Sequence, residues 1–198
     1  MAGFGLKPLD MKQDDLVTCL IPSTDSTITG IGDGVILAGS SDALTDSYHV
    51  PTVQRAAAGA GNPLWGVIVN CDQVSVENTS FSLERRHRPA SVGMYVQVHR
   101  AKHGNRYLIE PTAAVAKTAV GSVANLVAIT DADTTSGVSK MRLDQSTLQA
   151  SGNPTYQLRV VSVDPKDLRL AGKTIGTDII PIAVEINNIQ VSEGDDGI

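Results

Sequence analysis

Residues 92–100 read V-G-M-Y-V-Q-V-H-R, and apolar and polar side chains alternate along this stretch. Successive side chains of a β-strand point to opposite faces of the sheet. One face is therefore expected to carry Val92, Met94, Val96 and Val98. The other face is expected to carry Gly93, Tyr95, Gln97 and His99, with His99 pointing outward. This period of two predicts a strand that is buried on one face.

A tight connection follows this strand. The residues Lys102-His103-Gly104-Asn105 include two that tolerate positive φ, and Arg106–Glu110 is again strand-like. Two strands joined by so short a link typically form a β-hairpin. We therefore predict that 92–100 pairs with 106–110.

Similar segments recur from Asp15 to Val191, each bounded by Gly, Pro, Asn, Asp or Ser, the residues of turns. Further strands are predicted at Leu16–Ile21, Val35–Ala38, Leu64–Asn70, Gln157–Val163 and Ile179–Val191. Residues 39–63 look irregular, and 112–125 fit a short helix as well as a loop. The alternation of Gly30, Gly32 and Gly34 predicts a turn or bulge, since no Gly-Lys-Ser/Thr of a phosphate loop follows it. Many strands with short turns predict an all-β fold, as a β-barrel, jelly roll or sandwich.

The composition agrees with this fold class. Of 198 residues, 41% are hydrophobic but only 4% are aromatic, so the core must be built from Val, Ile, Leu and Ala. β-branched side chains pack well on a pleated sheet. The net charge of −5 disfavours a nucleic-acid partner. No apolar run has the roughly 20 residues of a membrane helix, so we expect a protein that is made in a cytoplasm and has no membrane partner.

The chain is expected to divide into three parts. Residues 1–14 mix charges with Gly and Pro and have no periodicity, which predicts an extended arm that needs a neighbouring molecule to lie against. Residues 15–191 are expected to form a single β domain. Residues 192–198, S-E-G-D-D-G-I, are expected to form an acidic flexible tail.

Catalytic and metal-binding motifs are missing from the sequence. It contains no G-x-S-x-G, S-x-x-K or H-E-x-x-H. Cys19 and Cys71 lie in apolar segments and are expected to be reduced and buried. Asp131 and Asp133 lie in a loop that lacks the glycine and terminal glutamate of a calcium-binding EF-hand. We predict that the protein is not an enzyme and holds no cofactor or metal.

Positive charge is concentrated between Glu84 and Arg106, where His87, His99 and His103 also lie. The cations of this stretch are Arg85, Arg86, Arg88, Arg100, Lys102 and Arg106. Together with Lys7 and Lys12 of the arm, they are the predicted partner-binding residues. Two interpretations stay open: a docking patch for an acidic surface, or a solvated strand end whose cations meet the chain's own acids. The histidines are not expected to converge on a metal, because nothing brings His87 near the other two.

Three strand-like segments carry a family resemblance. They are G-D-G-V-I-L at Gly32–Leu37, P-L-W-G-V-I-V at Pro63–Val69 and V-G-M-Y-V-Q-V at Val92–Val98. Lying between an irregular start and an apolar closing strand, they give 15–191 a layout that resembles the small β-rich cement or decoration proteins of tailed-phage capsids. The resemblance rests on this layout and on no diagnostic motif.

The resemblance implies a virion structural protein. Such a protein binds the outside of an icosahedral phage head and bridges neighbouring subunits of the major capsid protein, after synthesis in the host cytoplasm. A dimer or trimer set by the symmetry of the shell is expected. Two alternatives stay open: another head or tail accessory protein, and a carbohydrate- or receptor-binding module. Such a module would need several aromatic side chains to be exposed next to one another. The candidates are Tyr48, Tyr95, Tyr107, Tyr156 and Trp65.

Overall fold

The computed structural model of the protein describes residues 4–41, 50–75, 86–127, 131–150, 152–163 and 172–190. Within these ranges the regular structure is β-strand, apart from three single-turn 3₁₀ helices. The helices are η1 (Gln13–Asp15), η2 (Lys117–Ala119) and η3 (Gln145–Thr147). The predicted all-β fold class is confirmed.

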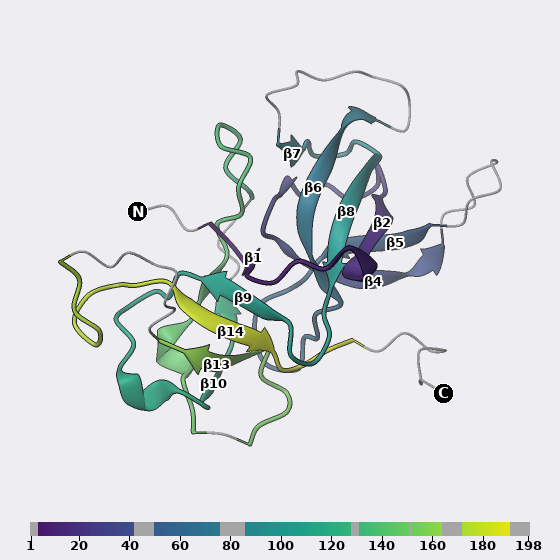
Figure 1. The fold of residues 1–198 in the computed structure, drawn as a ribbon. Coiled ribbons are helices and arrows are strands. Elements are labelled where there is room, and N and C mark those ends of the chain that lie inside the picture. Colours follow the sequence, from purple (N-terminus) through teal and green to yellow (C-terminus); the bar gives the residue numbers. More distant parts are fainter. Residues whose placement is uncertain are drawn as a thin grey trace.

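Five strands close into a barrel in the order β2-β5-β4-β6-β8 (Figure 1). Their bounds are β2 (Leu16–Ile21), β4 (Gly34–Ser41), β5 (Pro51–Arg55), β6 (Gly66–Ser75) and β8 (Met94–Arg100). β8 pairs antiparallel with β2 and β6, and a parallel contact of β2 with β5 closes the ring. The barrel core includes Met94, Val96 and Val98, so the predicted apolar face of this strand is confirmed.

The strand β5 lies in the segment 39–63 that was expected to be irregular, so that expectation is wrong for Pro51–Arg55. Thr52 and Val53 are buried and Gln54 is exposed. A five-residue strand that begins with proline and holds one β-branched hydrophobe carries too little alternation to be found by pattern. The barrel needs a strand between β2 and β4, and this demand overrides the weak local preference.

A second sheet has the order β1-β9-β14-β13-β10 (Figure 1). Its strands are β1 (Lys7–Pro8), β9 (Arg106–Ile109), β10 (Val123–Ala124), β13 (Leu158–Ser162) and β14 (Ile182–Ile186). Tyr107, Val160 and Val184 lie on its core-facing side, which also packs against Leu64 and Val67 of the barrel region. The predicted strands at 157–163 and 179–191 are present in shorter form, the latter beginning only after Pro181.

Two small ladders complete the fold. β3 (Thr29–Gly30) pairs with β7 (His87–Arg88), and β11 (Leu126–Val127) pairs with β12 (Arg142–Leu143). The stretch 112–125, left open between helix and loop, contains the single turn η2 and the short strand β10. The predicted turn at the glycine triplet is present, since Asp33 N donates to Gly30 O (3.1 Å) and Gly32 has φ +93°.

The predicted hairpin of 92–100 with 106–110 is wrong. β8 pairs with β2 and β6, whereas β9 pairs with β14 and β1. A turn does form, with Asn105 N donating to Lys102 O (3.1 Å), but it carries the chain from the barrel into the second sheet. In a closed barrel both edges of β8 are occupied, so the strand that follows it must find partners elsewhere.

A buried polar cluster joins the two sheets at this crossing. His99 is fully buried, which corrects the expectation that it points outward. Alternation does place it outside the barrel, but the second sheet covers that side. Its Nδ1 lies 2.9 Å from the Tyr107 hydroxyl. Asn105 donates to Asp15 Oδ2 (3.2 Å) and the Lys102 ammonium to Asp15 Oδ1 (2.5 Å), so the Asp15 carboxylate binds the turn.

The N-terminal segment 4–14 is extended, but it lies on its own chain and needs no neighbouring molecule. Leu6 is only 1% exposed and belongs to the core of the second sheet. Leu6 N donates to Gly32 O and Leu9 N to Arg106 O, both at 2.8 Å. At Gly5 (φ +67°) a Cβ would come within 2.4 Å of Gly32 O, so this close approach requires glycine. The predicted tail 192–198 lies outside the described residues.

Candidate docking surface

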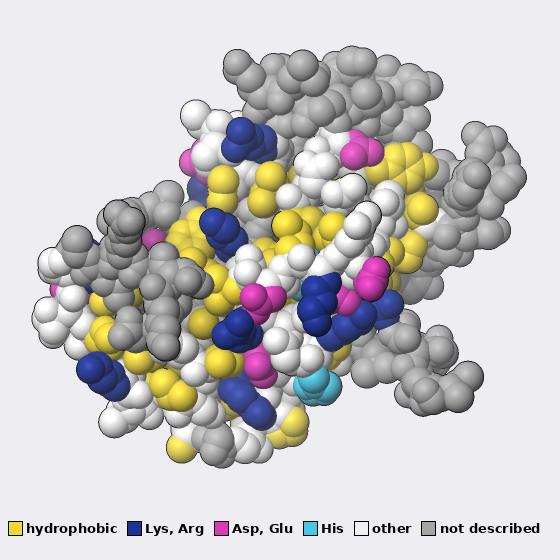
Figure 2. Space-filling model, viewed as in Figure 1, with side chains coloured by type: hydrophobic (Ala, Val, Ile, Leu, Met, Phe, Trp, Pro, Cys, Tyr) yellow, Lys and Arg dark blue, Asp and Glu magenta, His cyan; other side chains and the backbone are white. Residues whose placement is uncertain are grey.

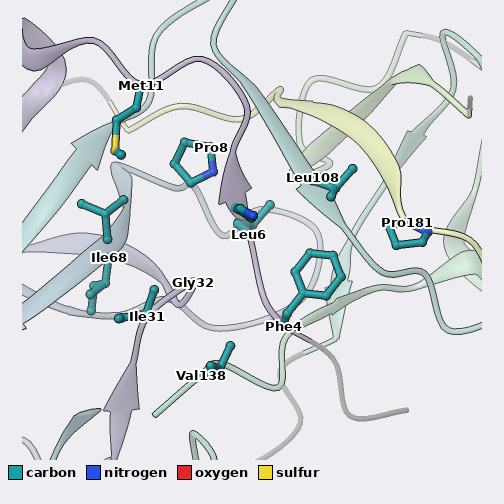
Figure 3. A pocket seen from close by; sticks show the side chains of 12 residues that line it. Phe4, Leu6, Pro8, Met11, Ile31, Gly32, Ile68, Leu108, Val138 and Pro181 are labelled. Carbon is teal, nitrogen blue, oxygen red and sulfur yellow. The ribbon is translucent and has the colours of Figure 1, made fainter. Parts of the chain in front are cut away.

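An apolar groove with a volume of about 450 Å³ runs along the N-terminal segment (Figure 3). Its lining comes from three parts of the fold that are far apart in the sequence. The N-terminal segment contributes Phe4, Leu6, Lys7, Pro8 and Met11. The barrel side contributes Ile31, Gly32, Ile68 and Val69. The second sheet and neighbouring loops contribute Leu108, Val138 and Pro181. We call this feature the N-terminal groove.

The backbone geometry explains why apolar side chains face this space. Lys7 lies opposite Leu108 in the β1–β9 ladder, and Pro8 lies opposite Tyr107. Leu6 is buried, whereas Met11 at the rim is 59% exposed. Figure 2 shows hydrophobic side chains at the surface of this face, interleaved with basic and acidic ones. A flexible methionine at the rim of an apolar groove suits contact with surfaces of varied shape.

The predicted partner-binding cations do not form a patch of one sign. Arg106 Nη2 lies 2.6 Å from Asp10 Oδ2, and Lys102 is paired with Asp15. For these two residues the structure agrees with the second interpretation, in which cations meet the chain's own acids. The remaining cations are more scattered. Lys7, Lys12 and Arg86 are exposed, Arg100 lies over the Trp65 ring at 5.7 Å, and Arg85 lies outside the described residues.

Arg88 has a structural role, and its prediction as a partner-binding residue is wrong. The residue is fully buried, and its guanidinium donates to four backbone carbonyls. The acceptors are Val92 O (2.7 Å), Thr27 O (2.7 Å), Pro22 O (2.8 Å) and Asp25 O (2.6 Å). Burial lowers its pKa, and the nearby Asp25 carboxylate opposes that shift. The sequence holds no signal for this role, because three of the four acceptors are backbone atoms of a loop some 60 residues away.

The two thiols are buried and reduced, as predicted. Burial raises the pKa of Cys19 and of Cys71 to about 12. A thiol is nucleophilic only as the thiolate, so both are held in the unreactive form near neutral pH. Across the described ranges no group of three or more His, Cys, Asp or Glu side chains could hold a metal ion.

The other predicted positions are also dispersed. His87 and His99 are buried on different ladders, and His103 is exposed in the turn after β8. Asp131 accepts from Ile28 N (3.1 Å), whereas Asp133 accepts from the backbone of the next turn. The aromatic residues form no platform in the described part of the chain. Trp65 and Tyr107 are buried, Tyr95 in β8 and Tyr156 in the turn before β13 are half-buried, and Tyr48 lies outside the described residues.

Comparison of the chain with family models, with curated proteins and with solved structures found no match in any of the three. In the part of the chain that the structure describes, no helix has the length and apolar character to cross a membrane.

Proposed function

We propose that this protein is a virion structural protein that binds the outside of a phage head as a cement or decoration protein. The observation that supports the proposal most directly is the N-terminal groove. It is an apolar groove that is open to the surface, with 12 lining residues of which only Lys7 is charged. Exposed apolar hollows of this kind mark surfaces that bind other molecules.

The groove is formed before a partner arrives. The N-terminal segment is tied to the barrel through Gly32 O and to the second sheet through Arg106 O. A rigid receptor loses little conformational entropy on binding, so a modest apolar contact can contribute net affinity. On a shell with many equivalent positions, weak contacts of one protein with adjacent subunits add through avidity.

The partner in this proposal is the major capsid protein, and the apolar side chains at its surface enter the groove. The exposed cations Lys7 and Lys12 lie in the same segment as the groove and would contact acidic residues around it. A dimer or trimer at a symmetry axis of the shell remains part of the proposal. The described aromatic side chains favour no carbohydrate-binding alternative, because they lie apart, and none of Trp65, Tyr95, Tyr107 and Tyr156 is exposed.

The direct test is to image particles assembled with and without the protein. We expect additional density outside the shell only when the protein is present. Met11→Asp, which places a charge at the rim of the groove, should reduce occupancy at least about tenfold. Val120→Asp is a matched control, since Val120 is 51% exposed and does not line the groove.

Particles that never carry density from this protein would end the capsid proposal. Equal occupancy for Met11→Asp and Val120→Asp would show that the groove is not the docking surface.

A further inference from the structure

The side chain of Asp33 lies behind the floor of the N-terminal groove. We use this term for the groove-lining residues Ile31, Gly32, Ile68 and Val138 (Figure 3). Asp33 follows Gly32 in the chain, but only 2% of it is exposed and it does not line the groove itself. It is therefore a buried acid next to a candidate docking surface, and the function proposed above makes no use of it.

Two hydrogen bonds of this carboxyl join the two loops that form the floor. Its Oδ2 accepts from Gly30 N (2.8 Å), and its Oδ1 accepts from the Ser139 hydroxyl (2.5 Å). The hydroxyl oxygen also accepts from Met141 N (3.0 Å), which fixes its position. Ser139 N in turn donates to Ile31 O (2.8 Å). The carboxyl therefore ties the loop between β3 and β4 to the loop before β12.

The backbone around Asp33 connects the floor to the other walls of the groove. Ile68 N in β6 donates to Asp33 O (2.9 Å), and Gly32 N donates to Ile68 O (2.8 Å). Gly32 O accepts from Leu6 N of the N-terminal segment (2.8 Å). The carboxyl, the barrel wall and the N-terminal segment are thus joined by a continuous set of hydrogen bonds.

The surroundings of Asp33 disfavour a charge on its carboxyl. Among the described residues no cation forms an ion pair with it, and Arg55 of β5 is paired with Asp131 instead (3.4 Å). The charge of Arg55 attracts the carboxylate, whereas that of Asp131 repels it. Burial is the largest effect and raises the pKa of Asp33 to about 6, although the hydrogen bonds from Ser139 and Gly30 oppose it.

Two other titratable side chains lie in this region. Burial raises the pKa of the Cys71 thiol in β6 to about 12, so this thiol is neutral at the pH at which Asp33 titrates. His87 is buried opposite Gly30 in the β3–β7 ladder. A pH dependence that originates from His87 would survive removal of the Asp33 carboxyl, so the two groups can be separated by experiment.

We propose that binding in the N-terminal groove is coupled to proton uptake at Asp33, so that the groove holds apolar ligands more tightly at mildly acidic pH than at neutral pH. This inference rests on the groove being a docking surface, as in the proposed function, but it does not require the partner to be a capsid protein.

The coupling follows from the position of the carboxyl behind an apolar floor. A ligand that fills the groove displaces water from the open side of the floor, and loss of water disfavours the charged form of a carboxyl. Above pH 6 the protein must therefore take up a proton on binding or hold the charge in a drier place, and either one costs free energy. Linkage is reciprocal, so a ligand that binds the protonated form better also raises the affinity of Asp33 for its proton.

The experiment uses the full chain and the uncharged apolar fluorophore N-phenyl-1-naphthylamine, whose emission rises in apolar surroundings. We expect saturable binding that is about fivefold tighter at pH 5 than at pH 7.5. Met11→Asp at the rim should weaken binding at both values of pH, whereas Val120→Asp should not, because Val120 does not line the groove.

Asp33→Asn removes the charge and keeps the shape of the side chain. Its affinity for the probe should be the same at pH 5 and at pH 7.5, whereas Asp14→Asn, at an exposed position, should retain the wild-type difference. If Asp33→Asn disturbs folding, the carbon-13 resonance of the Asp33 carboxyl in the wild-type protein reports the titration directly. Saturating probe should move the midpoint of this titration to higher pH.

Equal affinity of the wild type at the two values of pH overturns the proposal, and so does the absence of saturable binding. A pH dependence that persists in Asp33→Asn, or a carboxyl midpoint that the probe does not move, also overturns it. Probe binding that Met11→Asp leaves intact would place the probe outside the groove, with the same consequence.

This coupling and the proposed function can fail separately. Probe binding that depends on Asp33, without decoration of particles, would leave the coupling standing and remove the capsid proposal. Particles that are decorated equally well at pH 5 and at pH 7.5, but poorly by Met11→Asp, would support docking through the groove and overturn its coupling to Asp33.

Discussion

At the scale of single residues, the burial of charged side chains is the feature that the sequence does not predict. Arg88 lies in the most basic stretch of the chain, yet its buried guanidinium donates hydrogen bonds to four backbone carbonyls. Asp33 is likewise buried, accepting from Gly30 N (2.8 Å) and from the Ser139 hydroxyl (2.5 Å). Both side chains hold loops together through hydrogen bonds, which a pattern of hydrophobic residues cannot predict.

Arg88→Lys should destabilise the protein by about 3 kcal/mol. A lysine keeps the charge, but its ammonium cannot reach carbonyls arranged around a planar guanidinium, so buried acceptors lose their donors. Urea denaturation measures the change. Arg86→Lys, at an exposed position two residues away, is the control and should change stability by less than about 0.5 kcal/mol. Similar values for the two variants would contradict the structural role.

Asp33 should make stability depend on pH. Burial raises the pKa of its carboxyl to about 6, from an ordinary value of 3.8. Because the folded state holds the proton more tightly, this contribution is complete below pH 3.8 and is lost as the pH rises through 6. Asp33→Asn keeps the shape without the charge, so its stability relative to wild type should rise between pH 4 and pH 7, by up to about 3 kcal/mol.

The measurement is a series of urea denaturations across this range of pH. Asp14→Asn serves as a control, because the Asp14 side chain is exposed. A difference between Asp33→Asn and wild type that stays constant with pH would contradict the assignment.

At the scale of elements, the N-terminal segment is the piece whose placement the sequence least suggests. It has no periodicity, and only two of its residues form a strand. It nevertheless contributes a core residue, Leu6, and one wall of the N-terminal groove. Its position depends on the close contact of Gly5 with Gly32.

Gly5→Ala should detach this segment. The added Cβ would lie 2.4 Å from Gly32 O and 2.5 Å from the Ser139 Cβ, at a positive φ that alanine adopts poorly. We expect a loss of about 2 kcal/mol and faster hydrogen exchange at the amides of Leu6 and Leu9, which donate to Gly32 and Arg106.

The control for this change is Gly121→Ala. Gly121 also has a positive φ (+87°), but a Cβ there would meet nothing within 4 Å. If both variants exchange alike, the crowding at Gly5 is not what holds the segment.

At the scale of the whole molecule, the barrel and the second sheet share apolar contacts, and the His99–Tyr107 contact lies at their crossing. We therefore expect one cooperative unfolding transition. Trp65 fluorescence reports on the barrel, and far-UV circular dichroism reports on both sheets. The two signals should change at the same urea concentration, and two separate midpoints would show instead that the parts unfold independently.

The sequence predicts those features of the structure that depend on residues close together in the chain, and it misses those that depend on distant residues. Apolar segments bounded by turn residues locate β2, β4, β6, β8, β9, β13 and β14, and the period-two alternation is clearest in β8 and β14. It misses β5, whose pairing is imposed by barrel closure, and it misassigns β8 and β9 as a hairpin. The pairing partners of β8 and β9 and the burial of His99 both depend on the second sheet. The residues around position 99 carry no signal that this sheet covers them. The N-terminal groove is equally non-local, since its lining runs from Phe4 to Pro181.

The edge strands of the second sheet affect whether neighbouring copies of the protein can aggregate. The barrel is closed and offers no open edge. The outermost strand β1 is two residues long and ends in Pro8, which has no amide hydrogen to donate, and the opposite strand β10 is met by Gln149. Unpaired strand edges are where β proteins join one another into aggregates. With both edges blunted, many copies can stand close together without polymerising through their backbones.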